Sequence, residues 1–208
     1  KISNKLTFEI NSSQAVIASM IVPHSTLLSI RTEISLLFLA KPDSGTYLIA
    51  ATNGANSYAY TGQVTGKDYG GYTSVTISGD EIATKPDAAL EVTVKVTDGK
   101  FSMYDGNKYL CLNSSDNKLH FNASEQVVWV LDANGKINIT TYNSRYLKFN
   151  ATSGQERFAC YSSAQKDAYL YKKGDGSSTS YTDYSLDCGT TKTPSLKVDK
   201  TAFDFGTL

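Results

Sequence analysis

Short runs of alternating apolar and polar residues, separated by glycine-rich turns, recur three times along residues 45–173. Each copy opens with a glycine, one spacer and an apolar residue, at Gly45, Gly99 and Gly135. An aromatic-led run, a third apolar run and a closing run follow in each copy. Alternation with a period of two is typical of β-strands that bury one face. Four strands repeated three times predict an all-β chain with a β-trefoil fold.

The runs of the three copies occupy matching places. In order, they are residues 45–47, 58–60, 75–77 and 90–94 in the first copy, 99–101, 109–112, 119–121 and 127–131 in the second, and 135–137, 146–149, 158–161 and 168–171 in the third. Dipeptides such as Gly70-Gly71 and Asp98-Gly99 supply the positive φ angles that tight turns need. The first copy is longer, and its extra residues at 63–72 and 82–89 predict loops.

The same alternation predicts a core drawn from all three copies. Its members are Tyr47, Ile49, Phe101, Tyr109, Leu110, Leu112, Phe121, Trp129, Leu131, Ile137, Ile139, Tyr146, Leu147, Phe149, Phe158, Leu170 and Tyr171. Burial of a large apolar side chain stabilises a fold by about 1.5–3 kcal/mol. We therefore expect residues 44–173 to form an independent domain.

The flanking segments differ in composition from this region. Residues 1–43 contain no Gly and no Tyr, and alternation at 6–10 and 28–36 predicts a β segment of a preceding domain or an extension packed on the trefoil. A helical pattern competes with the strand at 28–36. Residues 174–193 are rich in Gly, Ser and Thr and predict a linker. Residues 194–208 begin a further alternating strand, which indicates a piece of a longer multidomain protein.

Charge narrows the range of partners. The sequence has 20 Lys and Arg against 20 Asp and Glu, with no run of like charge. Proteins bind nucleic acid largely through a positively charged surface, so we expect no nucleic-acid partner for this chain. No stretch reaches the roughly 18 apolar residues of a membrane-spanning helix, so we expect no membrane span.

Catalytic patterns are missing from the sequence. Its two histidines, His24 and His120, are far apart, and no phosphate-binding glycine loop or Gly-x-Ser-x-Gly motif is present. We predict that the chain is not an enzyme and holds no cofactor or metal. Cys111 and Cys160 fall in predicted strands and are expected to be buried apolar residues, while a pairing that includes Cys188 stays open.

Several segments together carry a family resemblance. They are residues 44–52, 78–82, 106–110, Trp129, 145–147 and 169–173. This set resembles a β-trefoil-like accessory module of secreted multidomain proteins of gut Bacteroidetes and some clostridia. The tail 196–206 resembles the opening strand of a BACON-type immunoglobulin-like domain. The resemblance implies a secreted or cell-surface location, with a lipid anchor conceivable outside this chain, and neighbouring domains in a longer polypeptide.

Two turns join aromatic and amide groups in the way that sugar sites do. Residues 104–109 and 142–146 occupy equivalent places in the second and third copies, and the glycine-rich loop at 69–72 adds two more tyrosines. The candidate ligand-binding residues are Tyr104, Asp105, Asn107, Tyr142, Asn143, Tyr69 and Tyr72. The alternative is that the tyrosines are core residues and that the rest only form turns.

These patterns predict a non-catalytic module that binds glycan or another surface polymer. A ricin-type sugar site needs Gln-x-Trp, and here only Gln126 and Trp129 come close, with an extra spacer. Trp129 is therefore expected in the core. The alternative function is a structural or protein-interaction spacer that positions a catalytic domain outside this chain.

Overall fold

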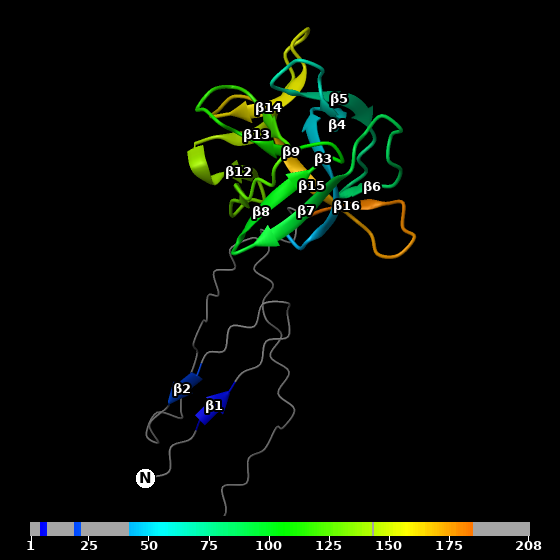
Figure 1. Cartoon of the computed structure of the whole chain (residues 1–208). Helices are drawn as coiled ribbons and strands as arrows, with labels where there is room; N and C mark the ends of the chain where they lie inside the picture. The colour runs from blue at the N-terminus through cyan, green and yellow to red at the C-terminus, as the bar shows by residue number, and fades with distance from the viewer. Residues whose placement is uncertain (1–4, 8–18, 22–41, 143, 185–208) are drawn as a thin grey trace, which may run out of the picture. The chain divides into compact units, whose positions relative to one another are not determined.

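The computed structural model describes residues 5–7, 19–21, 42–142 and 144–184 (Figure 1). The chain divides into two compact units, Lys1–Leu37 and Phe38–Leu208. In the first unit, β1 (Lys5–Thr7) and β2 (Ser19–Ile21) form an antiparallel pair. The strand expected at 28–36 and the tail at 194–208 lie outside the described residues.

The regular structure in the described part of the second unit is almost entirely β-strand. Its described residues form a single antiparallel sheet of 14 strands and one 3-10 helix, η1 (Thr140–Tyr142), with no α-helix among them. The all-β prediction is therefore confirmed. The strands are β3 (Gly45–Asn53), β4 (Asn56–Gln63), β5 (Gly70–Val75), β6 (Glu81–Ile82), β7 (Val92–Thr97), β8 (Lys100–Tyr104), β9 (Tyr109–Cys111), β10 (His120–Asn122), β11 (Trp129–Leu131), β12 (Ile137–Ile139), β13 (Tyr146–Asn150), β14 (Arg157–Tyr161), β15 (Lys166–Lys173) and β16 (Tyr181–Asp183).

The strand pairings of the second unit form a closed series. β3 pairs with β7, β7 with β8, β8 with β11 and β11 with β12, while β15 pairs with β3. β13 pairs with both β12 and β15 and so joins the two ends of this series. β4–β5, β9–β10 and β13–β14 pair as hairpins. β14 also pairs with β5, and the two lie at the same end of the unit (Figure 1).

The third strand of the first copy begins earlier than predicted. β5 starts at Gly70, so Gly70-Gly71 is strand rather than turn, and the loop expected at 63–72 ends before it. Glycine is required here because a Cβ on Gly70 would lie 2.4 Å from Cε2 of Tyr60. The glycine thus marks a close approach of a ring to the strand. The loop expected at 82–89 does lie outside the strands, apart from Ile82 at the end of β6.

The core is close to the predicted one. Trp129, Phe101, Phe149 and most of the other predicted members are fully buried, as are Cys111 and Cys160, which are free thiols. Tyr109, Phe121 and Tyr146 are half-buried, which corrects their assignment to the core. Phe121 lies in β10, which ends the order of strands in the sheet, so only one neighbouring strand covers it.

The first part of the predicted linker, residues 174–184, belongs to the folded sheet. β16 pairs with both β15 and β6, and Tyr181 is 2% exposed. The ring of Tyr184 packs edge-on against that of Tyr47, with 5.9 Å between centroids. Residues 174–180 form the β15–β16 turn, in which the amide of Gly174 donates to the carbonyl of Ser180. Residues 185–193 lie outside the described residues.

A half-buried ion-pair network links β13 to β15. Asp167 accepts hydrogen bonds from Lys148, which faces it across the two strands, and from Lys136 at 2.9 Å. Burial raises the pKa of the Asp167 carboxyl, but the hydrogen bonds from Lys148 and Lys136 outweigh it and the net shift is downward. The charged form of Asp167 therefore stabilises the folded state.

We expect Asp167→Asn to lower the free energy of unfolding by about 2 kcal/mol at pH 7, because Lys148 is left buried without its partner. Because the pKa of Asp167 is lower in the folded than in the unfolded chain, its charge stabilises the fold at pH values above the unfolded pKa of about 3.9. This stabilisation is lost as the pH falls through the folded pKa. Urea unfolding at pH 7 and pH 3 measures both effects, with the exposed Asp87→Asn as control. An equal deficit at both pH values would contradict this account.

Candidate functional site

The turn between β8 and β9 brings two tyrosine rings together. Tyr104 and Tyr109 face each other in the ladder, with 4.9 Å between ring centroids, and both are half-buried. The hydroxyl of Tyr104 donates to the carbonyl of Gly106 at 2.8 Å. Asn107, at the tip of this turn, is exposed. Tyr104 and Asn107 thus belong to one turn, with Tyr104 half-buried and Asn107 exposed.

Asp105 lies beneath that turn. The residue is 5% exposed, and its Oδ1 accepts hydrogen bonds from the amides of Asn107 and Lys108 at 3.0 and 2.9 Å. Its Oδ2 accepts one from the buried hydroxyl of Tyr60 at 2.8 Å. Burial, and then the nearby Asp105 charge, raise the pKa of Tyr60 well above its usual value, so the hydroxyl stays a donor. Asp105 therefore has the contacts of a turn-forming residue, the alternative that the sequence left open.

The equivalent segment of the third copy has a different shape. Tyr142 ends the 3-10 helix η1 rather than a tight turn, and its hydroxyl donates to the carbonyl of Asn113 at 2.9 Å. Its ring packs against the core. Asn143 lies outside the described residues. Tyr142 and Tyr104 are therefore held differently, and the two segments do not form matching sites.

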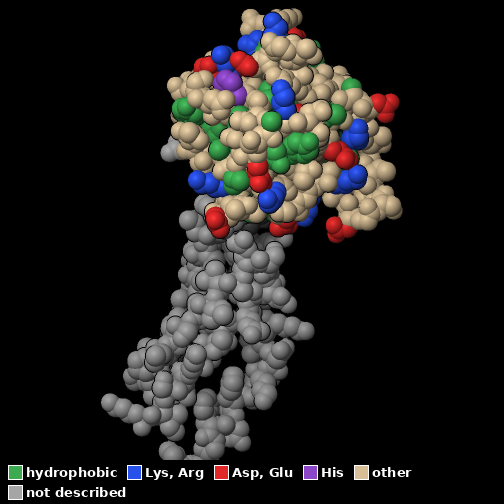
Figure 2. Space-filling view, viewed as in Figure 1, with side chains coloured by type: hydrophobic (Ala, Val, Ile, Leu, Met, Phe, Trp, Pro, Cys, Tyr) green, Lys and Arg blue, Asp and Glu red, His purple; other side chains and the backbone are tan. Residues whose placement is uncertain are grey.

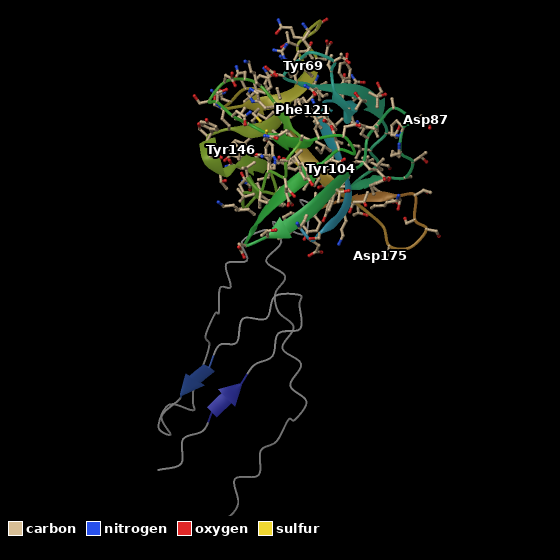
Figure 3. The ribbon with its side chains drawn as sticks, viewed as in Figure 1. Tyr69, Asp87, Tyr104, Phe121, Tyr146 and Asp175 are labelled. Carbon is tan, nitrogen blue, oxygen red and sulfur yellow. The ribbon has the colours of Figure 1, made fainter. Side chains whose placement is uncertain are left out.

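Tyr72 and Tyr69, the two tyrosines of the predicted glycine-rich loop, have different neighbours and different exposure. Tyr72, in β5, is 40% exposed and packs edge-on against Tyr58 and Phe149, with centroid distances of 5.6 and 5.4 Å. Tyr69 is half-buried, and the guanidinium carbon of Arg157 lies 5.3 Å from its ring centroid. Figure 3 shows Tyr69 at the upper end of the ribbon, above Tyr104.

Beside Arg157 the structure has a polar cavity of about 310 Å³. Turns of the second and third copies and the ends of β13 and β14 provide its walls. The lining residues are Asn117, Asn150, Gln155, Arg157, Tyr161, Ser162, Ser163, Ala164 and Gln165. Amide and hydroxyl groups predominate, and Asp, Glu and His are not among these lining residues. We name this hollow the amide cavity.

Backbone hydrogen bonds tie the three copies together at residues that adjoin the amide cavity in sequence or in the sheet. The amide of Leu119 donates to the carbonyl of Asp68 at 2.8 Å, which joins the second copy to the first. The amide of Cys160 donates to the carbonyl of Lys118 at 3.0 Å, which joins the third copy to the second. Arg145 donates to the side-chain oxygen of Asn117 and thereby orients it. The cavity walls are therefore fixed by the fold rather than carried on a single loop.

The two third-copy turns have defined local structure. Asn150 faces Arg157 in the β13–β14 register, and its Oδ1 accepts from the amide of Thr152 at 2.9 Å. In the β14–β15 turn, Ala164 has a φ of 65°, a left-handed conformation that costs a non-glycine residue about 1 kcal/mol or more. Backbone strain of this kind is concentrated at functional sites, so its position in the cavity wall is consistent with a binding role.

Comparison with known proteins leaves the family open. No protein-family model and no curated protein matches the sequence. Among solved structures, the chain is similar to the crystal structure of a lysenin pore, with 10% sequence identity and a TM-score of 0.40. That alignment covers 77% of this chain, and the chain spans 60% of the other. At this level the likeness carries no inference about function.

The surface of the second unit carries both signs of charge. Figure 2 shows Lys and Arg side chains interspersed with Asp and Glu, with scattered small apolar areas. None of the described residues belongs to a helix long and apolar enough to cross a membrane. In the same part of the chain, no three His, Cys, Asp or Glu side chains are grouped to hold a metal ion.

Proposed function

We propose that residues 44–173, within the second unit, form a β-trefoil. Each sequence copy supplies four strands in the same order, and the hairpins β4–β5, β9–β10 and β13–β14 are the second and third strands of the copies. The first and fourth strands pair in the series β3–β7–β8–β11–β12, and β15 pairs with β3. β12 also lies against β15. These pairings support a barrel of first and fourth strands with three hairpins attached.

The function that the geometry supports best is glycan binding by a non-catalytic module. The observation that carries this proposal is the amide cavity. Its volume of about 310 Å³ lies at the lower end of the range of small-molecule pockets, about 300–1,000 Å³. Most such pockets are apolar, whereas this one is lined by side chains that form hydrogen bonds. A ligand that fills it must therefore be rich in polar groups.

Sugar hydroxyls match this lining. A hydroxyl both donates and accepts a hydrogen bond, and the carboxamide of Gln155 or Gln165 offers one group of each kind. Glycoside hydrolysis uses a pair of carboxylates in most families. The residues described as lining the cavity include none, which favours binding over hydrolysis. We place the module in a secreted or cell-surface protein, beside other domains, on the strength of the family resemblance.

A glycan array probed with the full chain tests this proposal. We expect binding that falls about 30-fold in a Gln155→Ala/Gln165→Ala variant, because each lost hydrogen bond is worth about 1 kcal/mol. Gln155 is exposed and Gln165 is half-exposed, both between strands, so the variant should fold. Asn107→Ala removes an exposed amide from the β8–β9 turn and is the matched control, with no expected effect.

The array result separates the candidate sites and functions. Loss of binding in Asn107→Ala, with the double variant unaffected, would move the site to the predicted tyrosine turn and contradict the amide cavity. No binding to any glycan by the unaltered chain would reject the proposed function and favour the spacer.

A further inference from the structure

We propose that the amide cavity selects saccharides that carry a carboxylate and that Arg157 binds this group. The inference rests on the proposed glycan-binding function and names the class of glycan. Arg157 is the first residue of β14 and lines the cavity. The other lining residues are uncharged. An anionic group of a ligand would therefore meet one positive charge in the cavity, that of Arg157.

The guanidinium of Arg157 is held in place before any ligand arrives. Its Nε donates to the hydroxyl of Tyr161 at 3.1 Å, four residues along the same strand. Its carbon lies 5.3 Å from the ring centroid of Tyr69, an attraction between a cation and an aromatic face. The hydrogen bond from Nε leaves the two terminal nitrogens of the guanidinium to donate to a ligand. A planar carboxylate can accept two parallel hydrogen bonds from those nitrogens.

The charges around Arg157 also favour an anion. In the described part of the chain, Arg157 forms no ion pair. Asp68 and Asp116, which adjoin Tyr69 and Asn117 in sequence, both pair with Lys118. Glu156 adjoins Arg157 in sequence but does not line the cavity. A half-buried cation without a carboxylate partner, in a pocket of amides and hydroxyls, is complementary to an acidic sugar.

Asn117 adds a second donor to the same wall. Its side-chain oxygen accepts a hydrogen bond from Arg145, whose other terminal nitrogen donates to the carbonyl of Ser115. This contact leaves the NH₂ group of Asn117 to donate to a ligand. Amide NH₂ and guanidinium groups are both donors, so this side of the cavity suits acceptor oxygens more than hydroxyl protons.

A glycan array with paired ligands tests the proposal on the full chain. It carries glycans with uronic or sialic acids printed beside their methyl esters, which keep the sugar and remove the charge, together with sulfated and neutral glycans. We expect carboxylated glycans to bind at least tenfold more tightly than their esters, because a charge-assisted bidentate contact is lost on esterification.

Variants of Arg157 identify the residue that makes the distinction. Arg157→Gln should abolish the preference for acid over ester, and Arg157→Lys should retain part of it because the charge stays while the planar fork is lost. Lys118→Gln is the matched control: it removes a nearby positive charge that does not line the cavity, and we expect less than a twofold effect. If Arg157→Gln does not fold, the comparison of acid with ester on the unaltered chain still decides the question.

Each outcome bears on the proposal. Equal binding of acids and esters would overturn carboxylate selection and leave glycan binding in place. Preference for sulfated over carboxylated glycans would also overturn it. Preference for the acids that persists in Arg157→Gln would remove Arg157 from the site. Binding to no glycan would reject the proposed function and this inference together.

Discussion

Replacement of Trp129 by alanine is expected to lower the free energy of unfolding by about 4 kcal/mol. The side chain is fully buried, and Trp129 faces Phe101 in β8 and Ile139 in β12 across the sheet. Its indole Nε1 donates to the carbonyl of Leu110 in β9 at 2.7 Å. One side chain thus connects four strands, and alanine would leave both a cavity and an unpaired carbonyl.

Trp129→Phe separates these two effects. It keeps a large ring but leaves the carbonyl of Leu110 unpaired, so we expect a loss of about 1–2 kcal/mol. Trp129 is the one tryptophan of the sequence, so circular dichroism rather than tryptophan fluorescence should follow denaturant unfolding. A Trp129→Ala variant within about 0.5 kcal/mol of the unaltered chain would contradict the structure of this core.

Asp105→Ala has the second large expected effect, a loss of about 3 kcal/mol. It removes the acceptor of two turn amides and leaves the buried hydroxyl of Tyr60 without a partner. Tyr60→Phe in the Asp105→Ala background should recover part of the loss, because the unpaired hydroxyl is then gone. A double-mutant cycle by urea unfolding should give a coupling energy of about 1–2 kcal/mol.

The same variant distinguishes a structural role for Asp105 from a ligand-binding one. If Asp105 only forms the turn, Asp105→Asn, which keeps a side-chain oxygen, should be milder than alanine in stability and should bind glycan normally. An Asp105→Ala protein with unchanged stability and no glycan binding would return Asp105 to the site, as the sequence first predicted.

Strands and core could be predicted because they depend on local alternation. The closing run of the second copy, for example, places Trp129 and Leu131 inward, with Val130 between them half-exposed. Gly70 could not be assigned in this way: its role depends on the ring of Tyr60, which contacts it from another strand. Tyr181 was missed for a similar reason, since β16 is short and its turn has the composition of a linker.

The amide cavity could not be predicted from the sequence. Most of its members stand in turns, where Asn, Gln and Ser are common for local reasons, and no motif or repeat connects Asn117 with Gln165. Backbone hydrogen bonds between the copies bring them together. Tyr69 was selected as a ligand-binding ring, whereas in the structure it packs against Arg157, which lines the cavity.

The most direct test of the central claim is an amide NMR titration of the labelled full chain with the glycan that binds best on the array. If the amide cavity is the site, the largest shift changes will fall on residues 113–119, 151–157 and 161–165. Changes confined to the β8–β9 turn around Asn107, or to the strands around Tyr72, would place the ligand elsewhere and contradict the account.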